Sequence, residues 1–118
     1  MLKLLIDTLA EMPQGAIISH GFGRPMSYRG FYSEVAFEPA SNVTVGHMLA
    51  HARSALGATF TGYKGGEYTM HEYADCYLAE YGESTSDAIG PTLMAYWKEE
   101  AGLTPPSPAN PSDSESLA

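Results

Sequence analysis

The chain has 118 residues, 44% of them hydrophobic, and a formal net charge of −8. This length fits one folded domain. The charge disfavours non-specific nucleic-acid binding and docking on anionic membranes, because both depend on Lys and Arg. The single cysteine, Cys76, excludes an intrachain disulfide and a cysteine-based zinc site within one chain. It also fits a reducing compartment. We therefore expect a cytoplasmic protein with neither nucleic acid nor membrane as a partner.

The N-terminal residues predict an amphipathic helix. Leu2, Leu5 and Leu9 recur at helical spacing, with charged residues on the opposite side. We expect this helix to end near Pro13, because proline breaks a helix interior. Residues 16–26 then predict a short strand that runs into a loop rich in glycine and proline.

The central part of the chain predicts a strand followed by a helix. In residues 31–38 hydrophobic and polar side chains alternate, which places the hydrophobic ones on one face of a strand. Thr44 stands at an N-cap position, and an apolar stripe at helical spacing follows as far as Leu56. Gly57 comes directly afterwards, as expected at the C-terminal end of a helix.

The remaining residues complete an α+β pattern. Residues 58–70 predict two short strands around a Gly-Gly turn, and 75–82 predict another strand. Residues 91–100 form a strand or a helix, which periodicity does not decide. Residues 103–118, with four prolines and four serines, predict a disordered acidic tail after a compact domain of residues 1–102. The element order predicts a small antiparallel sheet packed against two or three helices.

Three groups of residues suggest metal or catalytic chemistry, and none is complete. His47 and His51 have a spacing that suits a metal on one helix face, but no third ligand is adjacent, so solvated surface is the better interpretation. His71 and Glu72 could act as acid and base, but no activated nucleophile accompanies them. Cys76 lies in a strand-like segment and is expected to be a buried small side chain. We expect no metal and no cofactor, and we favour a binding protein over an enzyme.

The scarce cations indicate an anion-binding site instead. Three of the six Lys and Arg residues lie in glycine-containing segments beside tyrosines. Arginine offers a planar fork to phosphate, lysine in a glycine-rich turn can meet a phosphate together with backbone N–H groups, and tyrosine offers a stacking face for a base. If segments 27–34 and 62–68 meet in space, they form a ligand site. Its expected residues are Arg24, Ser27, Tyr28, Arg29, Tyr32, Glu34, Tyr63, Lys64, Gly65, Gly66 and Tyr68.

A structural alternative uses the same residues. In that interpretation Arg29 pairs with Glu34 or Glu38, Lys64 occupies a solvated hairpin turn, and the tyrosines cap the sheet. The two interpretations differ in whether the cations and aromatic rings remain available to a ligand.

The two blocks resemble a family of small uncharacterised proteins from tailed phages. That family carries a Ser-Tyr/Trp-Arg-Gly-x-Tyr-x-Glu-x-Ala block, a short helix, and a Phe-x-Gly-Tyr/Trp-Lys-Gly-Gly-x-Phe/Tyr-Thr-Met block. The resemblance covers roughly residues 20–90 and brings no catalytic or binding assignment with it. The matching positions are Ser27, Tyr28, Arg29, Gly30, Tyr32, Glu34, Tyr63, Lys64, Gly65, Gly66, Thr69 and Met70.

The resemblance implies a phage accessory protein that acts against host defence. By analogy it is similar in build to compact α+β oligomers that sequester nucleotide signals in aromatic and cationic pockets. The leading hypothesis is thus a homo-oligomer that captures a small phosphorylated or nucleotide-like ligand without catalysis. The first alternative is an inhibitor that binds a host protein through an acidic or aromatic surface. The second is a small nucleotide hydrolase.

Overall fold

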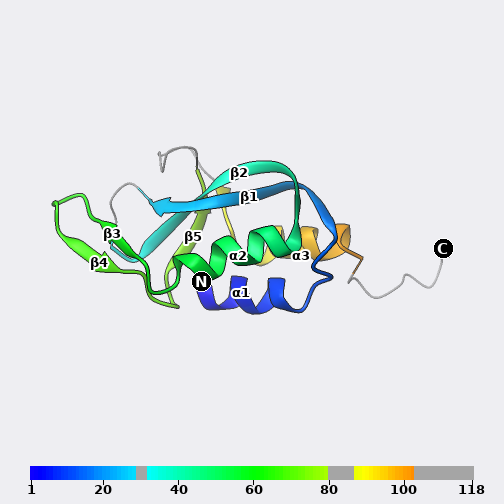
Figure 1. Ribbon diagram of the computed structural model, residues 1–118, viewed down its shortest axis with the longest axis horizontal. Helices are drawn as coiled ribbons and strands as arrows, with labels where there is room; N and C mark the ends of the chain where they lie inside the picture. The colour runs from blue at the N-terminus through cyan, green and yellow to red at the C-terminus, as the bar shows by residue number, and fades with distance from the viewer. Residues whose placement is uncertain (29–31, 80–86, 103–118) are drawn as a thin grey trace.

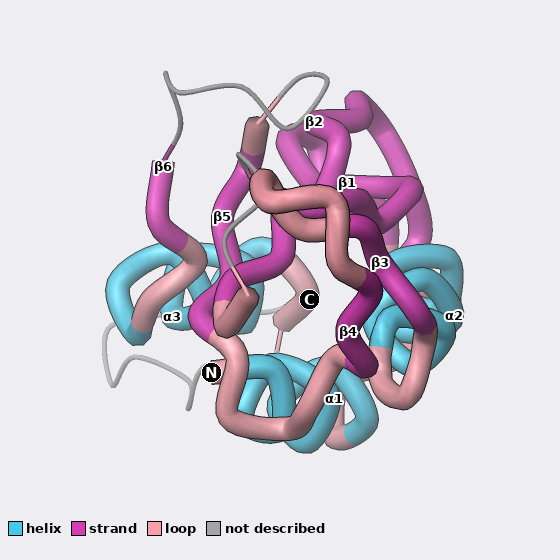
Figure 2. The backbone as a smooth tube through the Cα atoms, turned by 90° about the vertical axis from the view of Figure 1, so that its left-hand side faces the viewer, coloured by secondary structure: helices cyan, strands magenta, loops and turns pink. Residues whose placement is uncertain are grey.

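Three helices lie on one side of a four-stranded sheet, and a two-stranded hairpin projects from one end (Figures 1 and 2). The computed structural model describes residues 1–28, 32–79 and 87–102, so the predicted tail lies outside the described residues. The elements in chain order are α1 (Leu2–Ala10), β1 (Ile17–Ser27), β2 (Glu34–Thr44), α2 (Val45–Ala55), β3 (Thr59–Thr61), β4 (Glu67–Thr69), β5 (Asp75–Leu78), β6 (Asp87–Ala88) and α3 (Pro91–Glu100). None of the described helices is both long and apolar enough to span a membrane.

The four-stranded sheet has the order β1-β2-β5-β6. The β1/β2 and β5/β6 pairs are antiparallel, and the β2/β5 pair is parallel. The β3/β4 hairpin forms a separate antiparallel sheet. The expected α+β class is confirmed, with one parallel pair in an otherwise antiparallel arrangement.

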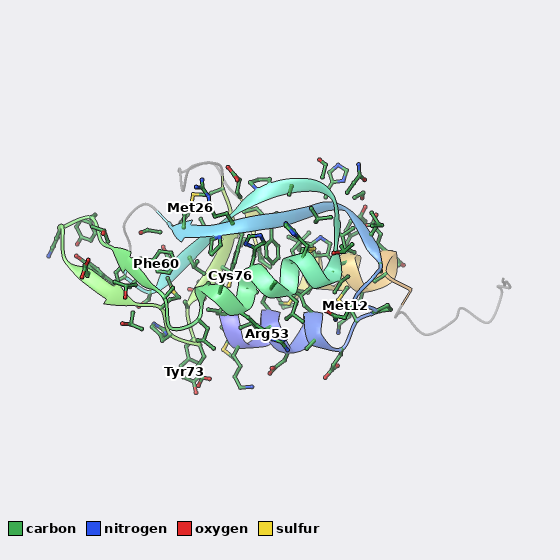
Figure 3. The ribbon with its side chains drawn as sticks, viewed as in Figure 1. Met12, Met26, Arg53, Phe60, Tyr73 and Cys76 are labelled. Carbon is green, nitrogen blue, oxygen red and sulfur yellow. The ribbon has the colours of Figure 1, made fainter. Side chains whose placement is uncertain are left out.

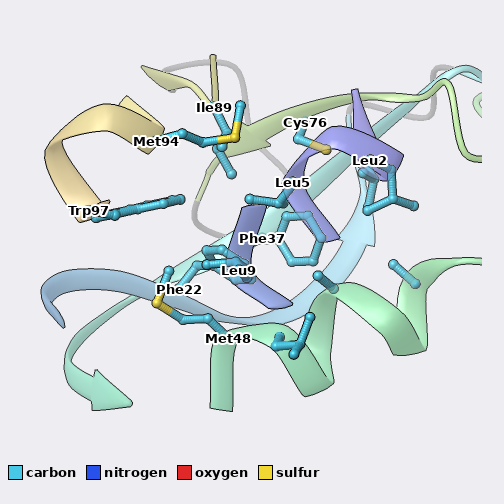
Figure 4. Close-up of a cluster of buried hydrophobic side chains, with 14 of the residues drawn as sticks. Leu2, Leu5, Leu9, Phe22, Phe37, Met48, Cys76, Ile89, Met94 and Trp97 are labelled. Carbon is cyan, nitrogen blue, oxygen red and sulfur yellow. The ribbon is translucent and has the colours of Figure 1, made fainter. Parts of the chain in front are cut away.

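The core lies between the helices and the inner face of the sheet. The α1 leucines pack with the α2 stripe and with inward-facing side chains of β1 and β2, and all of these are buried (Figure 4). Phe22 lies at the centre of an aromatic group, with its ring centroid 4.4 Å from that of Phe37 and 5.6 Å from that of Trp97. Burial of such large side chains supplies most of the energy that holds the layers together.

Both ends of α2 follow the prediction, but its last apolar residue does not. The Thr44 hydroxyl accepts a hydrogen bond from the His47 backbone N–H at 3.0 Å, which confirms the N-cap. Gly57 has a positive φ of 81°, a conformation that glycine adopts readily. Leu56 has an extended backbone and is 44% exposed, so its expected place in the buried stripe is wrong. The helix has already ended one residue earlier.

The glycine- and proline-rich segment after residue 20 is part of a strand. β1 continues through this segment to Ser27, so the expected loop is wrong. The pairing register with β2 shifts between Phe22 and Pro25, which is the irregularity that accommodates the extra residues. Proline lacks a backbone N–H. It is tolerated in β1 because β1 is an edge strand, in which every second backbone N–H points away from the sheet.

The segment 91–100 is a helix. Met94 and Trp97 are buried one helical turn apart. The Trp97 indole N–H donates to the His20 backbone carbonyl at 3.0 Å, and the Glu100 carboxylate accepts from the Ser19 backbone N–H at 3.1 Å. Side chains of α3 thereby satisfy backbone groups of β1.

Candidate functional site

Three tyrosines from the two matching blocks meet beside the β3/β4 hairpin. The ring centroid of Tyr32 lies 5.0 Å from that of Tyr68, edge to face, and 5.7 Å from that of Tyr63. We call Tyr32, Tyr63 and Tyr68 the tyrosine cluster. Each aromatic pair of this kind contributes about 0.5–1.5 kcal/mol beyond the area it buries. Segments 27–34 and 62–68 therefore meet through Tyr32, a condition that the sequence left open.

A buried glycine allows Tyr32 to lie on the hairpin. A Cβ atom built on Gly62 would lie 2.6 Å from the Tyr32 hydroxyl oxygen, and closer still to two ring carbons. The Gly62 backbone N–H donates to the Gly66 carbonyl at 2.7 Å, and its carbonyl accepts from the Gly65 N–H at 2.9 Å. Gly65 has a φ of 84° and makes the turn. Gly65 and Gly66 thus serve the hairpin backbone.

The cluster is also tied to the sheet and to the core. The hydroxyls of Ser27 and Tyr68 lie 3.2 Å apart, within hydrogen-bonding distance. The ring centroid of Phe60 lies 6.0 Å from that of Tyr68, and both side chains pack against the main core. Figure 3 labels Phe60 where the hairpin joins the body of the protein. The hairpin is therefore anchored to the end of β1 through side chains.

Lys64 is the cation of this region. It is exposed, and its ammonium nitrogen lies 5.6 Å from the centroid of the Tyr63 ring. Tyr63 is itself 61% exposed. A lysine above a tyrosine face at an exposed site contributes only about 0.5–1 kcal/mol, so a stronger anionic partner can displace it. The hairpin tip offers a positive charge and an aromatic surface side by side.

Tyr28 and Glu34 lie in a different group, on the sheet face opposite the helices. The rings of Tyr28 and Tyr77 stack with centroids 4.2 Å apart and an interplanar angle of 11°. The Tyr77 hydroxyl donates to Glu34 Oε2 at 3.2 Å. We call Tyr28, Tyr77 and Glu34 the outer-face cluster. The small side chains of Ala36 and Ala79 are buried beside Tyr28.

The outer-face cluster contains a residue that sequence reasoning missed. Tyr77 is not in either matching block, but strand alternation predicts that it points away from the buried Cys76 and toward the opposite face. Burial, and after it the Glu34 carboxylate, raises the pKa of Tyr77. Met26, which also packs here, lies on the side of the sheet away from the helices (Figure 3).

Arg24, an arginine of the expected site, lies beside a carboxylate of β2. The Arg24 guanidinium lies 3.9 Å from a Glu38 carboxylate oxygen, with both side chains exposed, so the pair adds little stability. Arg29 lies outside the described residues. Of the two expected cations that the structure describes, Arg24 and Lys64, it is Lys64 that lies over a tyrosine ring.

The candidate metal and catalytic residues behave as surface or core residues. The rings of His47 and His51 lie 4.6 Å apart, and the described residues contain no cluster of three or more potential metal ligands. His71 accepts a hydrogen bond at Nδ1 from the Tyr73 backbone N–H at 3.1 Å. Cys76 is buried, as expected, and burial raises its thiol pKa to about 12. A thiol with this pKa is not a nucleophile at neutral pH.

Comparison of the chain with protein-family models, with curated proteins and with solved structures found no match. The resemblance to phage proteins therefore stays a hypothesis that rests on the two sequence blocks.

Proposed function

We propose that the protein binds a small phosphorylated or nucleotide-like ligand at the β3/β4 hairpin and releases it unchanged. The observation that carries this proposal is the pairing of an exposed Tyr63 ring with the Lys64 ammonium at 5.6 Å. A base stacks on the tyrosine, and a phosphate takes the ammonium away from the ring. The contacts of Tyr32 with Tyr63 and Tyr68 hold the platform in position.

The strength of these contacts suggests that one hairpin is not the whole site. Stacking of a base contributes about 1–3 kcal/mol, and a hydrogen bond to a charged group about 1.5–3 kcal/mol. Together they give about 2.5–6 kcal/mol before the cost of association, which is near the roughly 4 kcal/mol of a millimolar complex and below the about 8 kcal/mol of a micromolar one. Tight capture requires further cations. Our proposal therefore includes Arg29 and a homo-oligomer in which a second copy adds to the site.

The biological setting is part of the same proposal. The resemblance to phage proteins suggests a cytoplasmic accessory factor that removes a nucleotide signal used in host defence. Binding without turnover is favoured because the groups gathered at the hairpin are aromatic rings and an ammonium, which bind rather than cleave. The rival functions are direct inhibition of a host protein and nucleotide hydrolysis that uses His71, Glu72 or Glu34.

A binding-and-release assay tests the proposal. The purified full chain is mixed with a panel of cyclic and ADP-ribose-type nucleotides and filtered. The retained fraction is then heated and analysed by mass spectrometry. We expect one nucleotide to be depleted from the filtrate and recovered intact. Tyr63→Ala and Lys64→Ala should each weaken its binding about tenfold or more, as the loss of about 1.4 kcal/mol requires. Arg29→Ala should abolish it.

Matched variants remove the same side chains elsewhere. Tyr73 is 63% exposed and Lys98 is exposed on α3, so Tyr73→Ala and Lys98→Ala should leave binding unchanged. A nucleotide recovered as a product would replace the proposal with the hydrolase. Depletion of no nucleotide, or equal losses in the hairpin and control variants, would rule out the hairpin site.

A further inference from the structure

The β3/β4 hairpin is a separate two-stranded sheet that projects from the body of the protein (Figure 1). Each of its strands has three residues, and a two-stranded hairpin is at best marginally stable on its own in water. Gly62, Gly65 and Gly66 near its tip increase the entropy that is lost when the hairpin becomes ordered. The hairpin therefore depends on contacts with the rest of the protein for its order.

Tyr32 makes the contact that reaches the outer part of the hairpin. Within residues 59–69, all of which the structure describes, Gly62 is the one buried residue. The ring of Tyr32 lies so close to the Gly62 backbone that it leaves no room for a Cβ atom. The same ring contacts Tyr63, which follows β3, and Tyr68 in β4. Tyr32 is therefore placed to hold both arms of the hairpin.

Other contacts hold the base of the hairpin to the body. Phe60 packs against the main core, and Met70 is a buried member of that core. The Met70 backbone N–H donates to the Ala58 carbonyl at 2.8 Å. These contacts do not involve Tyr32. A region with few buried side chains beyond a well-anchored base is one that opens locally while the rest of the protein stays folded.

We propose that Tyr32 controls whether the outer part of the hairpin, residues 61–67, is ordered. With the Tyr32 ring on Gly62 the hairpin is closed. When the ring leaves, residues 61–67 open while the helices and the four-stranded sheet stay folded. Tyr32 is then a positioning residue, which acts on a ligand through the hairpin.

The role of this opening rests on the function proposed above. Tyr63 and Lys64 lie within the part that opens, so the closed hairpin is the form that holds them side by side. A ligand held by both groups binds the closed hairpin and shifts the equilibrium toward it. Opening therefore lowers the apparent affinity by the fraction of molecules that are open.

Limited trypsin digestion of the full chain, without any nucleotide, tests the proposal. Lys64 is exposed near the tip, and proteolysis of a transiently opened segment follows the population of its open form. Tyr32→Ala should raise the rate of cleavage after Lys64 about tenfold, through loss of two aromatic contacts. Tyr32→Phe keeps the ring and should stay within about twofold of the wild-type rate. Tyr73→Ala removes a 63% exposed tyrosine elsewhere and should also leave the rate unchanged.

A second measurement on the wild-type protein separates opening of the hairpin from unfolding of the whole chain. Arg53 lies within α2, between the buried residues Ala52 and Ala55, so cleavage after it requires α2 to unfold. Both cleavage rates are measured at urea concentrations below the unfolding transition. Opening of the hairpin exposes less surface than unfolding of the chain, so cleavage after Lys64 should rise more weakly with urea than cleavage after Arg53.

Each other result overturns the proposal. An unchanged rate in Tyr32→Ala would show that Tyr32 does not control the hairpin, and an equal rise in Tyr32→Phe would show that the ring is not responsible. Equal urea dependence at Lys64 and Arg53 would show that the hairpin opens only with the whole chain, a result that needs no variant to fold. Trp97 is fully buried, so its fluorescence confirms the fold of each variant. Because the digestion contains no nucleotide, its failure is distinct from a failure of the binding-and-release assay.

Discussion

Replacing Gly62 by alanine should destabilise the hairpin by forcing Tyr32 away from it. The added Cβ would lie 2.6 Å from the Tyr32 hydroxyl oxygen, far inside the roughly 3.5–4.0 Å of a favourable contact. Two responses are open to the protein. Either the hairpin backbone shifts, or the Tyr32 ring rotates and leaves its neighbours.

The two responses cost similar energies, so the expected loss of stability is the same whether the backbone shifts or Tyr32 rotates. Overpacking with a backbone shift costs about 1–3 kcal/mol. Rotation of Tyr32 forfeits its contacts with Tyr63 and Tyr68, and two aromatic pairs at about 0.5–1.5 kcal/mol each give about 1–3 kcal/mol again. For a domain of this size, 1 kcal/mol lowers the melting temperature by about 4–8 °C.

Urea unfolding followed by Trp97 fluorescence measures the free energy of unfolding, and near-ultraviolet circular dichroism reports the tyrosine environment. Gly66→Ala is the matched control, because its Cβ would lie 3.7 Å from the same hydroxyl, an ordinary contact. In the Tyr32→Ala background, Gly62→Ala should lose most of its effect, which a double-mutant cycle measures as coupling. A Gly62→Ala protein with wild-type stability and an unchanged tyrosine spectrum would refute the packing of Tyr32 on Gly62.

Three further outcomes are expected from single residues. Thr44→Ala should lower the free energy of unfolding, measured by urea unfolding, by about 1 kcal/mol, because α2 loses its N-cap. The control Thr92→Ala, at an exposed position of α3, should change it by less than about 0.5 kcal/mol. Cys76 should be inert to a thiol reagent at pH 8 in the native protein and react fully in denaturant, because burial raises its pKa to about 12. Burial, and then the neighbouring His47, lowers the pKa of His51 in the folded state, so the unfolded chain binds the proton first. Stability should therefore fall as the pH drops below about 6.5, and His51→Gln should reduce that fall in pH-dependent unfolding.

Rules that use only neighbouring residues predicted the two ends of α2 and the buried face of α1. Thr44 caps α2 because its hydroxyl replaces a missing backbone partner, and Gly57 ends that segment because it tolerates a positive φ. The spacing of the α1 leucines likewise placed them in the core. Each of these outcomes depends on residues within a few positions of one another.

Pairing between distant segments was beyond those rules. Gly23 and Pro25 look like loop residues, but β1 is held extended by β2, and its edge position removes the usual penalty for proline. The helical state of 91–100 depends on Trp97 reaching the His20 carbonyl across the chain. The local sequence of residues 91–100 suits a strand and a helix about equally, and burial of the large Trp97 side chain favours the helix.

In the candidate site, too, the residue types follow from the sequence, whereas the contacts between distant segments do not. The sequence indicated which residue types to consider, but it left open whether the two blocks meet. The contact between Tyr32 and Gly62 was not predictable, because it depends on how the hairpin folds back toward β2. Neither was the stack of Tyr28 on Tyr77, because Tyr28 follows β1 and Tyr77 lies in β5, and these two strands are not adjacent in the sheet.

Strand geometry explains why one dense stretch of sequence serves two surfaces. Ser27 is the last residue of β1 and directs its hydroxyl to Tyr68 on the hairpin. Tyr28 follows it in a bend, and its ring lies on the outer face with Met26, two residues earlier, where it stacks on Tyr77. Adjacent matching residues at the end of a strand thus contribute to two separate side-chain clusters. The members of the block therefore need not converge on one place, because the tyrosine cluster and the outer-face cluster are made of different residues.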